Sequence, residues 1–204
     1  MQEIITPSLA KSLTYLEYRQ LVTDLLKEGK STGNEQSEDL TKYSELNEVR
    51  MNRLDKTIQI TDEVISGLSN LQSNYIWVVI SEGWCGDAAQ LLPIINKMAE
   101  LSEKIDLRIA LRDENEVLMN QFLTNGGKAI PKLLVLDAET LTVLSDWGPR
   151  PEEAKNLILD YKAQHGIVDE TAKTNLQKWY LQDKGISTQK EILKLVEKAE
   201  KQLV

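Results

Sequence analysis

The residue best placed for chemistry in this sequence is its single cysteine, Cys85. It stands where a short apolar run ends and a helical pattern begins, in the segment EGWCGDA at residues 82–88. Free N–H groups and the dipole at the start of a helix stabilise a thiolate, which is the form that attacks disulfides. The alternative is that Cys85 is a small buried hydrophobe, as many lone cysteines are. Its place between Trp84 and Gly86 favours a reactive or binding role.

Two carboxylates accompany the cysteine. Asp87 falls in the first helical turn, where a negative charge complements the helix dipole, but beside Cys85 it opposes the thiolate and raises the pKa of the thiol. Glu82 directly follows the apolar run. It is either a proton acceptor or a solvated group. We therefore take Glu82 and Asp87 as candidate proton or electrostatic partners of Cys85.

The pattern around Cys85 predicts alternating strands and helices. Over residues 75–163 the predicted order is strand, helix, strand, helix, strand, strand, helix. The second of these helices covers Val117 to Leu123 and ends at Asn125-Gly126-Gly127. Helical crossovers imply parallel pairing of the first two strands, and the last two strands form an antiparallel hairpin. The predicted strands are residues 75–80, 105–111, 132–136 and 141–144.

Helical patterns flank this region on both sides. A capping box at Thr14–Glu17 opens a helix that stops at Gly29, and the polar residues 30–37 form a loop. The next helix is expected to bury one apolar stripe, and a short third helix follows near Val64 and Leu68. Past Gly166 two more helices are expected, the second opening at a capping box from Thr188 to Glu191. The apolar stripe of the helix that follows residues 30–37 consists of Leu40, Tyr43, Leu46, Val49 and Leu54.

Three features together resemble the thioredoxin superfamily over residues 72–165. They are Trp-Cys-Gly between a strand and a helix, Pro93 eight residues after Cys85, and Ile130-Pro131 before the third strand. Residues 43–57, 82–90 and 147–151 are also similar to a Bacteroidetes-type bacterial thioredoxin-like family of uncharacterised function. The resemblance implies a three-layer α/β/α sandwich with a mixed sheet. Residues 1–71 would then be an N-terminal helical extension, and residues 166–204 a C-terminal helical extension packed on the same domain.

The resemblance also implies a substrate groove. Pro131 would be a cis-proline lying with Ile130 against Cys85, and the loop at Trp147-Gly148 would lie against the sulfur too. An extended substrate could add there like a strand. Arg150, on the same loop, could hold an anionic group. The implied substrate-binding residues are Trp84, Gly86, Ile130, Pro131, Trp147, Gly148 and Arg150.

Departures from the thioredoxin pattern define the functional hypotheses. Ala88 stands where thioredoxins have the resolving cysteine, and apolar Val79 and Ile109 stand where they have a buried Asp and Lys. The first hypothesis is an enzyme, a monothiol disulfide oxidoreductase that acts through Cys85 with an external resolving thiol. The alternative is a non-catalytic protein-binding module. A weaker third is a metal cluster shared by two copies of the chain through Cys85 and an external thiol.

Bulk properties limit the partners. The chain has 204 residues and a net charge of −8, with acids and bases interspersed, which argues against a nucleic-acid surface. No apolar run reaches membrane length, and the first residues lack a secretory pattern. With one cysteine, the expected location is the cytoplasm. No metal or cofactor is expected, since the one histidine, His165, stands alone. The expected partner is a protein or a low-molecular-weight thiol or disulfide, and a homodimer is left open.

Overall fold

The computed structural model describes residues 1–203. Over these residues four strands form one sheet in the order β2-β1-β3-β4. The strands are β1 (Tyr75–Ser81), β2 (Ile105–Leu111), β3 (Lys132–Asp137) and β4 (Val143–Trp147). The helices are α1 (Gln2–Lys11), α2 (Tyr15–Lys27), α3 (Glu38–Thr57), α4 (Asp62–Ser69), α5 (Gly86–Ala99), α6 (Glu116–Met119), α7 (Glu152–His165), α8 (Glu170–Asp183) and α9 (Ile186–Leu203).

The sheet is mixed, as the order of elements predicts. β1 pairs in parallel with β2 and antiparallel with β3, and β3 and β4 form an antiparallel hairpin. Val79 in β1 lies opposite Ile109 in β2 and Leu133 in β3. All three side chains are fully buried. The middle of the sheet is therefore apolar where the thioredoxin pattern would place a buried ion pair.

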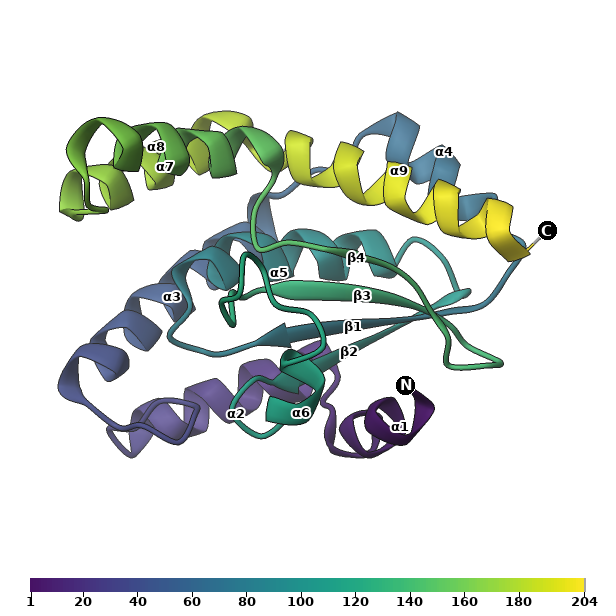
Figure 1. Ribbon diagram of the computed structural model, residues 1–204, viewed down its shortest axis with the longest axis horizontal. Helices are drawn as coiled ribbons and strands as arrows, with labels where there is room; N and C mark the ends of the chain where they lie inside the picture. Colours follow the sequence, from purple (N-terminus) through teal and green to yellow (C-terminus); the bar gives the residue numbers. More distant parts are fainter. Residues whose placement is uncertain (204) are drawn as a thin grey trace.

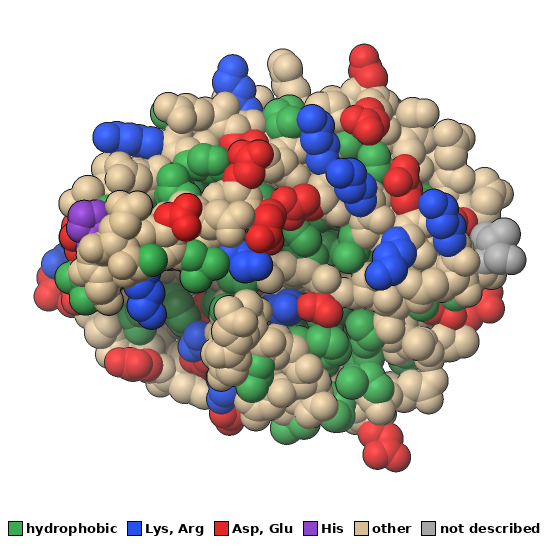
Figure 2. All heavy atoms as spheres, turned by 45° about the horizontal axis from the view of Figure 1, so that its top comes forward, with side chains coloured by type: hydrophobic (Ala, Val, Ile, Leu, Met, Phe, Trp, Pro, Cys, Tyr) green, Lys and Arg blue, Asp and Glu red, His purple; other side chains and the backbone are tan. Residues whose placement is uncertain are grey.

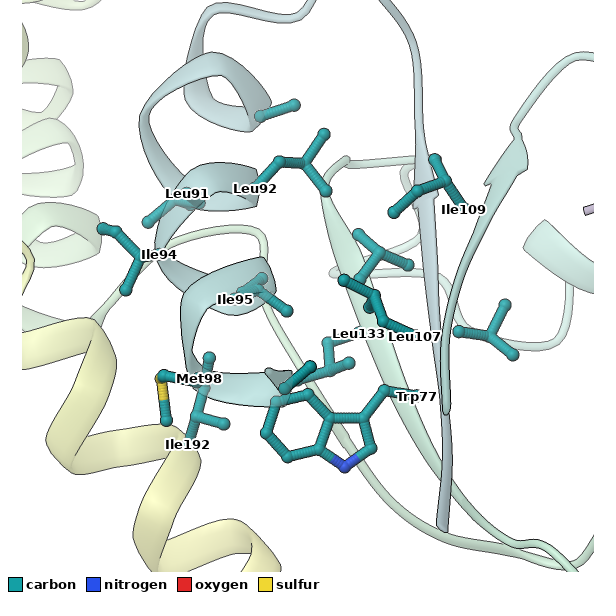
Figure 3. Close-up of a cluster of buried hydrophobic side chains, with 14 of the residues drawn as sticks. Trp77, Leu91, Leu92, Ile94, Ile95, Met98, Leu107, Ile109, Leu133 and Ile192 are labelled. Carbon is teal, nitrogen blue, oxygen red and sulfur yellow. The ribbon is translucent and has the colours of Figure 1, made fainter. Parts of the chain in front are cut away.

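The main core lies between the sheet and α5. Figure 3 shows Leu92 and Ile95 of α5 directed toward Trp77, Ile109 and Leu133 of the strands. α5 is apolar over most of its circumference because α3 and α9 also pack on it. A helix that is buried on several sides has little freedom to shift. It holds its first residue, Gly86, in a fixed position at the end of β1.

Helices cover the sheet on both sides. Figure 1 shows α1, α2 and α6 on one side and α4 and α9 on the other, with α7 and α8 paired beyond the sheet. α2 begins at the predicted capping box, in which the Thr14 and Glu17 side chains each accept a hydrogen bond from the other residue's backbone N–H. α9 packs on β4, where Glu191 accepts a hydrogen bond from Trp147 Nε1 at 2.7 Å. The terminal helices are thus parts of the same packed body.

The predicted apolar stripe of α3 is wrong. Tyr43, Leu46 and Val49 are 42%, 47% and 66% exposed, and only Leu54 of that stripe is fully buried. The face that packs on α5 instead carries Ser44, Asn47, Met51 and Leu54. Small and polar side chains lie inside because α3 passes close to the backbone before Cys85. Asn47 Nδ2 donates there to the Gly83 carbonyl at 2.9 Å.

Two other helix predictions are also wrong in extent. α6 is a single turn, because the chain leaves the helix after Met119 and reaches Asn125 through turns. α9 begins at Ile186, so Thr188 lies inside the helix, fully buried, and is not its cap. Gly185, with φ of +81°, ends the preceding turn and brings α9 against Ile94 of α5.

The surface carries mixed charge. Figure 2 shows basic and acidic side chains interspersed over the face that includes α8 and α9. Within residues 1–203, no helix combines the length and the apolar composition needed to cross a bilayer.

Candidate functional site

Cys85 is the N-cap of α5, as its position in the sequence predicts. Its sulfur accepts a hydrogen bond from the Ala88 N–H at 3.4 Å. The thiol in turn donates to the carbonyl oxygen of Ile130 at 3.3 Å. The sulfur is therefore held between a helix start and the loop before β3, and the side chain is 8% exposed.

The loop facing the sulfur contains a cis peptide bond between Ile130 and Pro131. A second loop closes on this one. Gly148 has a φ of +118°, and a Cβ at this position would lie 2.3 Å from the Pro131 carbonyl oxygen. No side chain fits in that space, so only glycine lets the two loops meet. The structure thus places Ile130 against Cys85 and Gly148 against Pro131.

Asp87 is the centre of a polar cluster beside the cysteine. Arg150 Nη2 lies 2.6 Å from Asp87 Oδ2, and the Tyr180 hydroxyl donates to Asp87 Oδ1 at 2.9 Å. The Asp87 side chain is nearly buried, and that of Arg150 is 27% exposed. The sequence suggests that Arg150 binds an anionic group of a ligand. In the structure, the guanidinium is instead paired with the Asp87 carboxylate of the same chain. Tyr180 comes from α8, outside the region of thioredoxin resemblance.

The thiol is protonated in this environment. Burial raises the pKa of Cys85 to about 12, and the negative charge of Asp87 adds to the shift. The backbone N–H groups of α5 and the charge of Arg150 act in the opposite direction and are outweighed. The expectation that the helix start favours a thiolate is therefore wrong for the resting protein, because desolvation is larger than the helix effect.

Glu82, three residues before Cys85, is fully buried. Its Oε1 accepts from the Asp113 N–H at 3.0 Å, while its Oε2 has no hydrogen-bond partner in the described residues. Burial raises the pKa of this carboxyl. The expectation of a solvated Glu82 is wrong. Gly33 lies beside Oε2, since a Cβ there would approach it to 3.5 Å.

The segment between Glu82 and Cys85 is tied to the N-terminal helices. Gly83 N–H donates to Thr32 Oγ1 at 2.7 Å, and its carbonyl accepts from Asn47. Trp84 is half-buried, and the Arg112 guanidinium lies 4.7 Å from its ring centroid. These contacts fix the turn that presents Cys85. No local pattern points to Thr32 or Asn47 as partners of Gly83, from which they lie 51 and 36 residues away.

The remaining candidates lie around this centre. Gly86 faces Arg50 of α3, whose Nη1 would be 3.6 Å from an added Cβ. Trp147 is half-buried, and its Nε1–H donates a hydrogen bond to Glu191. The polar group of the indole therefore contacts α9. In residues 1–203, no cluster of three or more acidic, histidine or cysteine side chains is arranged to hold a metal ion.

The fold has relatives among solved structures. A protein of unknown function, PA1234 from Pseudomonas aeruginosa, is 19% identical, with a TM-score of 0.57 over 92% of this chain and 99% of the other. An HIV epitope-scaffold is 18% identical, with a TM-score of 0.56 over 91% of this chain and 98% of the other. No curated protein matches the sequence. At this coverage, the terminal helices belong to the shared fold.

A thioredoxin family model, Thioredoxin_9, matches residues 33–173. The match begins in the loop before α3 and ends within α8. It therefore includes Cys85, the cis-proline and part of both helical flanks, while the predicted domain boundaries at residues 72 and 165 stay a prediction. With this match and the mixed sheet between helices, the chain belongs to this thioredoxin family and has a thioredoxin-like fold with a single buried cysteine.

Proposed function

We propose that the protein carries out monothiol thiol–disulfide exchange at Cys85 and that an external thiol completes the reaction. The observation that carries the proposal is the position of Sγ, at the start of α5 and 3.3 Å from the carbonyl that precedes cis-Pro131. A disulfide that reaches this loop meets the sulfur and the backbone of Ile130 together. The proposed contacts for such a substrate are Trp84, Gly86, Ile130, Pro131, Trp147 and Gly148.

The reaction has two balanced steps. Cys85 first loses its proton to solvent, and its thiolate attacks one sulfur of a disulfide RS–SR′, forming Cys85–S–SR and releasing R′S⁻. A low-molecular-weight or protein thiolate R″S⁻ then attacks the SR sulfur, forming RS–SR″ and regenerating the Cys85 thiolate. Ala88 supplies no second thiol, so the external thiol is required.

The raised pKa of Cys85 sets the pH dependence of the first step. At neutral pH nearly all of the thiol is protonated, so we expect alkylation by iodoacetamide to be slow and to accelerate steadily with pH. An exposed thiol would level off above a pKa of ~8.5. A plateau near that value in the native protein would contradict the environment described for Cys85.

The exchange itself is tested with bis(2-hydroxyethyl) disulfide. We expect one 2-mercaptoethanol adduct at Cys85 by intact-mass analysis, which added thiol removes, and no adduct on Cys85→Ser. Circular dichroism under the same conditions shows whether the protein stays folded during the reaction. The absence of an adduct on the folded protein at pH 9 would overturn the proposal.

The burial of Cys85 favours a second candidate, a non-catalytic binding module. In that case the surface around the Pro131 loop binds an extended chain, and the sulfur only packs. The probe is an unfolded, carboxymethylated polypeptide, which has no free thiol. If Cys85→Ser binds it as tightly as the native chain does, and the disulfide gives no adduct, the binding module is the better description.

A further inference from the structure

A cleft of about 460 Å³ lies between α3 and the turn from α8 to α9. We call it the α3–α8 cleft. This volume falls in the range of small-molecule sites, about 300–1,000 Å³. Its apolar lining comes from Leu54 and Ile58 on one side and Leu181 and Ile186 on the other. Tyr180, whose hydroxyl binds Asp87 beside Cys85, also lines the cleft.

The positive charges of the cleft are unpaired. Arg53 and Lys184 line it, and neither forms an ion pair within residues 1–203. The nearby carboxylates are engaged elsewhere: Asp55 binds Arg19 and the Tyr15 hydroxyl, and Asp183 accepts from Ser187.

A third cation, Arg50, adds to the positive charge near the cleft. Arg50 precedes Arg53 by one helical turn, is half-buried, and donates to the Asn47 side chain at 2.9 Å. Burial and then the charge of Arg53 lower the pKa of Arg50. The cations therefore repel one another, and an anion bound between Arg53 and Lys184 would relieve that repulsion.

The walls are fixed before any ligand binds. Gln189 fixes the segment that follows α3 through two hydrogen bonds of 3.0 Å. Its Nε2 donates to the Gln59 carbonyl, and its Oε1 accepts from the Thr61 N–H. Lys97 of α5 donates to the Ile58 carbonyl at 2.8 Å. Because these contacts are internal, the cleft keeps its shape at little further entropic cost.

We propose that the α3–α8 cleft binds a small organic anion with an apolar body, held by Arg53 and Lys184 at its rim and by the leucine and isoleucine side chains inside. An apolar lining alone would accept a neutral ligand equally well. The two unpaired cations make the negative charge the distinguishing feature of the ligand. This site is separate from the exchange proposed at Cys85 and does not depend on it.

The probe is 8-anilinonaphthalene-1-sulfonate, a small aromatic anion whose fluorescence rises in an apolar site. We expect saturable one-to-one binding to the native chain. Arg53→Gln combined with Lys184→Gln should weaken it by about tenfold, the sum of two exposed charge contacts. The matched control, Lys56→Gln with Lys178→Gln, removes two exposed charges from the same helices outside the cleft and should leave binding unchanged.

A neutral probe separates charge from apolarity. N-phenyl-1-naphthylamine has the same aromatic body without the sulfonate, and its affinity should be the same for the native chain and the Arg53→Gln, Lys184→Gln variant. Leu181→Glu, at a position 58% exposed, places a negative charge in the wall and should abolish anion binding without unfolding the protein, as checked by circular dichroism. Non-saturable binding, equal loss in the control pair, or unchanged binding in Leu181→Glu would overturn the proposal.

Discussion

Two buried carboxylates lie close to Cys85, and their surroundings differ. Asp87 has a guanidinium on one oxygen and a phenol on the other. Glu82 has one backbone N–H on Oε1, and its Oε2 has no hydrogen-bond partner among the described residues. A buried carboxylate is stable only when its charge is compensated. Arg150 and Tyr180 compensate that of Asp87, whereas burial raises the pKa of Glu82.

The difference has a structural origin. Arg150 follows the Gly148 loop, and Tyr180 comes from α8, so two late elements of the chain converge on Asp87. Glu82 faces the loop at Gly33 and the backbone at Asp113, and within residues 1–203 no cation is bonded to it. Charge pairing thus dominates the surroundings of Asp87, and desolvation dominates those of Glu82.

The largest effect is expected from removing Arg150, the cation that is paired with Asp87. Arg150→Ala leaves a buried carboxylate unpaired and should lower the free energy of unfolding at pH 7 by about 3 kcal/mol. Urea unfolding at pH 7 measures the loss.

The control for that variant is Arg150→Ala combined with Asp87→Asn. If the charge of Asp87 causes the loss, the double variant should be more stable at pH 7 than Arg150→Ala alone. Equal stability of the two would show that Arg150 acts through packing and not through its charge.

A smaller effect is expected from removing the hydroxyl group of Tyr180. Tyr180→Phe removes the donor to Asp87 Oδ1 and should cost about 1.5 kcal/mol, the usual range for a hydrogen bond to a charged group. Thermal unfolding measures it, with Tyr43→Phe, at an exposed position of α3, as the control. An unchanged midpoint for Tyr180→Phe would mean that water replaces the phenol.

Asp87→Asn removes the fixed negative charge beside the sulfur. The charge of Asp87 raises the pKa of Cys85 and that of Arg150 lowers it, so the variant should have a lower thiol pKa. We expect alkylation at pH 8 to be about tenfold faster, one pKa unit. Asp106→Asn, an exposed residue on β2, is the control and should react like the native chain.

The smallest effect is expected at Glu82. Its pKa is raised in the folded state, so the stabilisation from its protonated form is present at low pH and is lost as the pH rises through the folded pKa. Glu82→Gln should therefore be about 1 kcal/mol more stable than the native chain at pH 7.5 and equal to it near pH 4. Urea unfolding at both pH values checks this, with exposed Glu63→Gln as the reference. A variant less stable at pH 7.5 but not near pH 4 would show that the ionised form is needed.

The order of strands and helices around Cys85 could be predicted from sequence because each depends on local pattern. A continuous apolar run marked β1, and Pro131 before β3 marked the loop that faces the sulfur. The inward face of α3 could not be predicted. Its apolar stripe fits helical spacing, but contact with the Gly83 backbone selects Ser44 and Asn47 for the inside.

The site was predictable only where its residues are near in sequence or follow the family pattern. Cys85, Ile130 and Arg150 do: the Cys85 thiol contacts the Ile130 carbonyl, and Arg150 pairs with Asp87, two residues after Cys85. Tyr180 does not, because it lies 93 residues from Asp87 on a helix whose pattern says nothing about its partner. The pKa of the thiol was also out of reach, since it depends on how completely the two flanks cover the sulfur.

The burial of Cys85 has a practical consequence for spectroscopy. The native chain offers a maleimide reagent no readily ionised sulfhydryl at neutral pH, and it has no second cysteine to remove. A cysteine introduced at a solvent-facing position such as Val49 would react first and alone. Spin labels or fluorophores can therefore be attached to this protein one position at a time with Cys85 left in place.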